Sequence, residues 1–186
     1  RRKQPPQRRK PPGRRRPTHP IKTKISALFR VEKAEFFKEK NSDMEQTRFY
    51  YTFEPVAIDV SDEKEAKKYG RPFIGFENDL SDRFRRLKEV YDRAEKEDVH
   101  ITVNAFPPVS GVAEIAVFHE IKFRLFSRAV KKQCFFLCIT KYEADGTMDL
   151  YEYETNDFRE TEQIFRDFLQ EGALPDLTRW KRIPIG

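Results

Sequence analysis

The sequence predicts an α+β fold: an antiparallel sheet of about six strands, two main helices packed on it, and a disordered basic N-terminal tail. The strongest signal lies in residues 111–157, which are typical of three consecutive strands. The last two strands are joined by Asp145-Gly146, a pair that supplies the positive φ of a tight hairpin turn. One face of the first strand holds Ile115, Val117, His119, Ile121, Phe123 and Leu125, and the other holds Glu114, Ala116, Phe118, Glu120, Lys122, Arg124 and Phe126.

Two later segments show the spacing of amphipathic helices. Residues 79–97 carry one apolar stripe, made of Leu80, Phe84, Leu87, Tyr91 and Ala94. Residues 158–170 follow Asp157-x-x-Glu160, a capping-box pattern, and end before Gly172. The predicted buried face of this second helix is Ile164, Phe165, Phe168 and Leu169.

The other elements follow from shorter patterns. Strands are predicted at 21–32, 47–60 and 99–106, and the first two can pair as a long hairpin. Pro55 marks a bulge or an edge in the second of these strands, because proline cannot donate to the ladder. A short helix is predicted at 61–70. Residues 71–77 are expected to be an extended connector, and residues 173–186 irregular.

Length and charge allow one domain with tails. The chain has 186 residues and a net charge of +6, but residues 1–20 hold nine basic residues and no acid. The remaining 166 residues therefore carry 28 basic and 31 acidic groups. No apolar run reaches the roughly 18 residues that span a bilayer, so no membrane association is expected. Cys134 and Cys138 lie about 13 Å apart on a predicted strand, too far for a disulfide, which favours a reducing compartment.

The N-terminal tail, residues 1–20, contains six prolines and almost no apolar residue. Such a composition predicts disorder, because it cannot bury enough surface to offset the entropy of ordering. Arg14, Arg15 and Arg16 are candidates for binding nucleic-acid phosphates. The same tail also fits a nuclear address, a polyproline ligand for a protein partner, or a solubilising segment without a specific partner.

A second basic cluster follows one strand and its turn. It consists of Lys122, Arg124, Arg128, Lys131 and Lys132, and Phe118 and Phe126 share a face with its first members. Basic groups beside aromatic rings can hold a nucleic-acid backbone and stack bases, although a charged outer sheet face has the same pattern. The sequence contains no phosphate-binding glycine loop, no His-Glu-x-x-His and no Gly-x-Ser-x-Gly. We therefore assign no catalytic residue, metal ligand or cofactor to this chain.

Four stretches carry a family resemblance. They are Pro20-Ile21-Lys22 with Phe29-Arg30-Val31, then Phe49-Tyr50-Tyr51-Thr52-Phe53, then Ile101-Thr102-Val103-Asn104-Ala105-Phe106-Pro107-Pro108, and finally residues 174–186. In order and spacing the chain resembles the N-terminal domain of an Argonaute protein running into its first linker. The resemblance implies a tail at 1–20, the domain at 21–172 and the start of the linker at 173–186. Lys96-Glu97-Asp98-Val99 stands where the family usually has Tyr-Asp-Gly, which implies a divergent member.

The resemblance also implies a function. The parent protein would load a small guide RNA and use it to find target RNA, in the cytoplasm, the nucleus or both. The family's N-terminal domain acts as a wedge that helps separate the strands during loading and limits guide–target pairing. Slicing acids and Mg²⁺ belong to other domains of such a protein. The alternative from composition alone is a nuclear nucleic-acid-binding or protein-interaction module with a basic tail.

Overall fold

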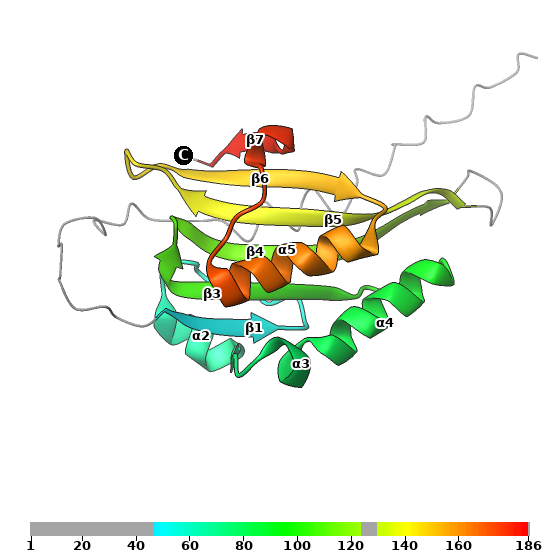
Figure 1. The fold of residues 1–186 in the computed structure, drawn as a ribbon, viewed down its shortest axis with the longest axis horizontal. Helices are drawn as coiled ribbons and strands as arrows, with labels where there is room; N and C mark the ends of the chain where they lie inside the picture. The colour runs from blue at the N-terminus through cyan, green and yellow to red at the C-terminus, as the bar shows by residue number, and fades with distance from the viewer. Residues whose placement is uncertain (1–46, 124–129, 186) are drawn as a thin grey trace, which may run out of the picture.

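The computed structural model describes residues 47–123 and 130–185, and it has the α+β architecture that the sequence predicts (Figure 1). One antiparallel sheet has the strand order β2-β1-β3-β4-β5-β6-β7. Its strands are β1 (Arg48–Thr52), β2 (Arg71–Pro72), β3 (His100–Val109), β4 (Val112–Phe123), β5 (Val130–Tyr142), β6 (Met148–Thr155) and β7 (Lys181–Pro184). The helices are α2 (Glu63–Tyr69), α3 (Phe76–Asp79), α4 (Ser81–Asp92), α5 (Phe158–Glu171) and the short 3₁₀ turn η1 (Leu177–Arg179).

The main core lies between the sheet and α3, α4 and α5, which lie on one side of it in Figure 1. We call this side of the sheet the helix face. The alternation read from β4 is correct here, because Ile115 and Val117 are fully buried on this face. Rings from the two main helices meet in the middle, where the ring centres of Phe84 and Phe165 lie 5.2 Å apart. The predicted helix stripes therefore form this core, except that Ala94 lies past the end of α4 and Val90, which was not in the predicted stripe, is fully buried.

The opposite face of the sheet is also apolar at its centre. Ala116, Cys138 and Leu150 are each at most 4% exposed and pack together on this face. Towards β1, Tyr50 and Phe106 pack with Ala66 of α2, so α2 covers that corner. Cys134 and Cys138 are both free and buried, on the shared face that their spacing predicts. The centre of the sheet is thus buried on both of its faces.

Local sequence signals set both ends of α5. The Asp157 carboxylate accepts hydrogen bonds from the backbone N–H groups of Arg159 and Glu160, at 2.8 and 3.2 Å. Gly172 closes the helix in the left-handed conformation, at φ 64°. Between these caps, Ile164, Phe165, Phe168 and Leu169 are buried, as their spacing predicts.

Asp157→Ala is expected to lower the free energy of unfolding by about 1 kcal/mol, because it leaves two N–H groups of the first turn without their acceptor. Urea denaturation followed by circular dichroism measures this change. Asn156→Ala, one residue earlier and also exposed, is the matched control and should be near neutral. Equal effects from the two variants would contradict the capping role.

Several predicted boundaries differ from the structure. The strand predicted at 47–60 ends at Thr52, since Pro55 interrupts the pairing. The helix predicted at 79–97 begins at Ser81, ends at Asp92 and is preceded by the separate turn α3. The connector predicted at 71–77 contains β2 and the start of α3. The strand predicted at 21–32, its hairpin with the next strand and the tail lie outside the described residues.

The C-terminal segment is the largest difference. We predicted that residues 173–186 are irregular, and this is wrong for half of them, because η1 and β7 form there and β7 is the last strand of the sheet. Arg182 anchors β7, and its Nη2 lies 2.5 Å from the carboxylate of the buried Asp149 on β6. Trp180 is buried and stacks on Tyr153 with ring centres 5.1 Å apart.

None of the described helices is long and apolar enough to cross a membrane.

Candidate nucleic-acid interface

Strands β4 and β5 form a hairpin that extends past their neighbours (Figure 1). The last residue of β4 that pairs with β3 is Phe118, and pairing of β5 with β6 begins at Phe135. Residues 120–123 and 130–134 therefore continue as two strands, and no third strand of the described residues pairs with them. We call this part the projecting ribbon. It carries every described member of the basic cluster that the sequence predicted.

Two of the eight predicted basic residues have described side chains, Lys122 and Lys132. They lie directly opposite each other across the ribbon. Lys131 belongs to β5, but its side chain is outside the described set, as are the whole residues Arg14, Arg15, Arg16, Arg124 and Arg128. The structure thus brings together the one pair of these residues that it describes, at the projecting end of the hairpin.

Each lysine of this pair has an acidic partner. The Nζ of Lys122 lies 2.7 Å from Glu120, and Lys132 pairs with Glu154 at the end of β6. The lysine side chains are 42% and 45% exposed, so both can still meet a ligand from solvent. Exposed ion pairs of this kind contribute little to stability, and their lysines can exchange partners at small cost. Among the described side chains, these two lysines and two carboxylates form two ion pairs on and beside the ribbon.

Cys134 completes this network from the buried side. Its thiol lies 4.0 Å from Glu120, and the ligand atoms of Glu120, Cys134 and Glu154 all lie within 4.8 Å of one another. These three groups are close enough together to share one metal ion, with a sulfur atom and two carboxylates as ligands. Burial, followed by the two carboxylates, raises the pKa of Cys134 to about 11, so the sulfur is a thiol at neutral pH. A metal here would have to displace that proton and both lysines.

The base of the projecting ribbon is anchored on the helix face. Gln133 donates a hydrogen bond from Nε2 to the backbone oxygen of Tyr91 at 3.2 Å. The Tyr91 ring stacks on Phe135 with centres 4.4 Å apart, and it meets His119 at 5.8 Å. The end of α4 therefore supports the hairpin where β3 and β6 stop. These contacts continue the packing of the helix face to the base of the ribbon.

Phe118 does not have the role that the sequence suggested. We expected it beside Lys122, free to stack on a base. It is half-buried, packs against the apolar centre of the opposite face and stacks on His100 with ring centres 5.7 Å apart. Its ring is therefore part of the fold. Phe126, the other expected ring, lies outside the described residues.

A row of polar side chains crosses the middle of the opposite face. Asn104, Glu114 and Thr140 stand in register on the three central strands. Asn104 and Thr140 are fully buried, and neither side chain makes a hydrogen bond of standard geometry. Glu114 keeps some exposed surface, but burial raises the pKa of its carboxyl to about 7, and the nearby Thr140 hydroxyl offsets only part of that shift. Because burying polar groups without hydrogen bonds costs free energy, this row is expected to destabilise the centre of the sheet.

Sequence reasoning missed the acids that balance the lysines. Glu120 could have been found, because it lies two residues before Lys122 and so on the same face of the same strand. Glu154 could not, since its contact with Lys132 depends on the β5–β6 register. The polar row was missed for the same reason.

No family model matches this chain, and no curated protein or solved structure matches it significantly.

Proposed function

We propose that this chain is the N-terminal wedge domain of a small-RNA-guided gene-silencing protein of the Argonaute family. It assists strand separation during guide loading and limits guide–target pairing. Four sequence motifs in the family's order, spread over residues 20–186, support the family. The observation that supports a wedge is the projecting ribbon, because it presents a two-stranded edge with two lysines opposite each other.

The physical action follows from that shape. A two-stranded ribbon placed in the path of an RNA duplex occupies the space that the next base pair needs, so stacking stops there. Lys122 and Lys132 can hold the phosphates on either side of the separated pair. Their partners Glu120 and Glu154 weaken this hold. Weak phosphate contacts suit a wedge, since the strands must move past it during loading.

The lysine pair gives a direct test on purified protein. Lys122→Gln together with Lys132→Gln is expected to weaken binding of a short blunt RNA duplex. The slope of log K against log salt concentration should fall by about one for each lysine. Filter binding at several salt concentrations measures the slope. The unmodified chain and the double variant carry the same basic tail, so its contribution to the slope cancels in the comparison.

Lys67→Gln is the matched control. Lys67 is also ion-paired, with Glu63, and its side chain is 51% exposed on α2, which packs at the β1 corner of the sheet away from the ribbon. It should leave the salt slope unchanged. If the double variant has the same slope as the unmodified chain, Lys122 and Lys132 do not contact the RNA. That result would overturn the wedge assignment to these residues.

A protein-interaction module is the second candidate. The observation that favours it is an exposed, partly apolar edge of the sheet at β2, far along the sheet from β5 in strand order. This edge is a separate surface from the projecting ribbon, so the two functions are compatible in one domain.

A further inference from the structure

Exposed apolar side chains gather in one short stretch of the described chain. Among the described residues, the large hydrophobic side chains classed as exposed are Tyr69, at 44%, and Ile74, at 80%. They lie five residues apart, on either side of β2. Because β2 is the outermost strand, its outer side faces no other described strand. An exposed apolar pair on an open sheet edge is typical of a binding surface.

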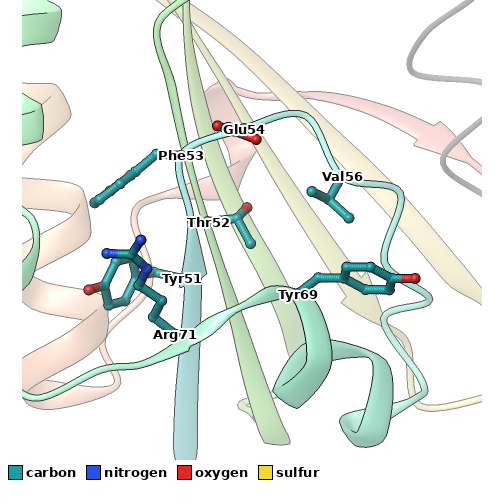
Figure 2. A pocket seen from close by; sticks show the side chains of 7 residues that line it. All are labelled: Tyr51, Thr52, Phe53, Glu54, Val56, Tyr69 and Arg71. Carbon is teal, nitrogen blue, oxygen red and sulfur yellow. The ribbon is translucent and has the colours of Figure 1, made fainter.

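A notch of about 250 Å³ opens at the same edge, at the point where β2 begins (Figure 2). It exists because β2 pairs only with Tyr50 and Tyr51, so on this side the edge of β1 beyond Tyr51 has no described strand beside it. Its apolar and aromatic wall consists of Tyr51, Phe53, Val56 and Tyr69, and its polar groups are Thr52, Glu54 and Arg71. In Figure 2, Arg71 lies beside Tyr51 at one end and Tyr69 lies at the other. The notch has room for one large apolar side chain.

The charges around the notch are unequal. The acids of α2 are used inside the domain: Asp62 caps the helix, Glu63 meets Arg48 and Lys67, and Glu65 accepts the Asp59 N–H at 3.0 Å. The cations are exposed, and the Nζ of Lys68 lies 4.7 Å from the centre of the Tyr69 ring. Within the described part of the chain, no ion pair joins the exposed Lys64, Lys68 or Arg71 to a carboxylate. The surface beside the notch therefore favours an acidic ligand.

We propose that this edge binds an extended acidic peptide of a partner protein, which places one large apolar side chain in the notch. The peptide runs along β2, with carboxylates near Lys68 and Arg71 and further apolar contact at Ile74. From residue 69 to residue 74 an extended chain covers roughly 16 Å, which a short peptide spans easily. The apolar wall of the notch and the exposed aliphatic side chain of Ile74 favour a peptide over a nucleic-acid backbone. The proposal does not depend on the RNA function.

The test is a selection of twelve-residue peptides displayed on phage, with the immobilised 186-residue chain as bait. Because the basic tail also attracts acidic peptides, the counter-selection uses the Tyr69→Ala, Arg71→Glu double variant, which keeps the tail. Both residues are exposed, so this variant should keep the circular dichroism spectrum and melting temperature of the unmodified chain. We expect enrichment of acidic peptides with one large apolar residue on the unmodified chain alone.

Selected peptides are then measured by fluorescence anisotropy. Tyr69→Ala and Arg71→Glu should each weaken binding about tenfold or more, as expected for a central anchor. Arg159→Glu, an exposed arginine on α5, should change it less than twofold. Equal enrichment on the unmodified chain and the double variant would overturn the proposal. So would binding of a twelve-nucleotide single-stranded RNA that depends on Tyr69 and Arg71 while no peptide is enriched, which would assign the notch to RNA.

Discussion

Phe168→Ala is expected to lower the free energy of unfolding by about 3–5 kcal/mol. Phe168 is fully buried between α5 and the sheet, and its ring meets Phe49 of β1 with centres 5.7 Å apart. Truncation removes these contacts and leaves a cavity between two rigid elements that cannot collapse to fill it. Chemical denaturation followed by tryptophan fluorescence, which reports on the buried Trp180, measures the loss.

The control is Tyr69→Ala, another aromatic truncation. Tyr69 is 44% exposed, so its removal should change stability by no more than about 0.5 kcal/mol. A Phe168→Ala protein as stable as this control would mean that α5 does not pack on the sheet as described. The helix stripe read from the sequence would then have been assigned to the wrong contact.

Glu114→Gln is expected to stabilise the protein by about 2 kcal/mol at pH 8 and to have little effect near pH 4.5. Burial raises the pKa of this carboxyl to about 7 in the folded state. In the unfolded chain it ionises near 4.5, so the ionised group disfavours folding from about pH 4.5 upwards, with the full penalty above pH 7. Glutamine removes the charge and keeps a polar group beside Thr140. We place the expected gain below the full linkage value because Glu114 retains some exposed surface.

Urea denaturation of both proteins at pH 4.5 and pH 8 measures this difference. His100 and His119 act in the opposite direction, because burial lowers both histidine pKa values below their usual value near 6.5. Their contribution to stability is present above pH 6.5 and is lost as the pH falls. Since both proteins carry the same histidines, this loss cancels in the comparison. A gain of equal size at the two pH values would show that the carboxyl of Glu114 does not titrate as described.

The sequence was sufficient for the fold where one residue type determines one local structure. Asp157, Gly172 and the alternation of β4 gave the correct ends of α5 and the correct faces of the sheet. It was insufficient where an element forms only by pairing with a distant segment of the same chain. Residues 181–184 have no strand pattern of their own, and they become β7 because the edge of β6 and the Asp149 carboxylate are there to pair with them. Such pairing is a tertiary effect that periodicity does not contain.

The candidate site was predicted in a similar, partial way. The alternation placed Lys122 on the outer part of β4, but the sequence could not show that its hairpin extends past β3 and β6. Nor could it show that Glu154, 22 residues from Lys132, balances that lysine. The notch was beyond sequence analysis altogether, since it results from the short length of β2. Charge and periodicity identify candidate residues, whereas register decides which of them act together.

The central claim is that the parent protein carries a small guide RNA. The most direct measurement is to purify that protein from its native cells and to sequence the RNA bound to it. We predict a population of short RNAs with a sharp length distribution and a preferred 5′ nucleotide. An absence of enriched RNA, or RNA of random length, would contradict the account and leave the β2 edge, with its peptide ligand, as the functional surface of the domain.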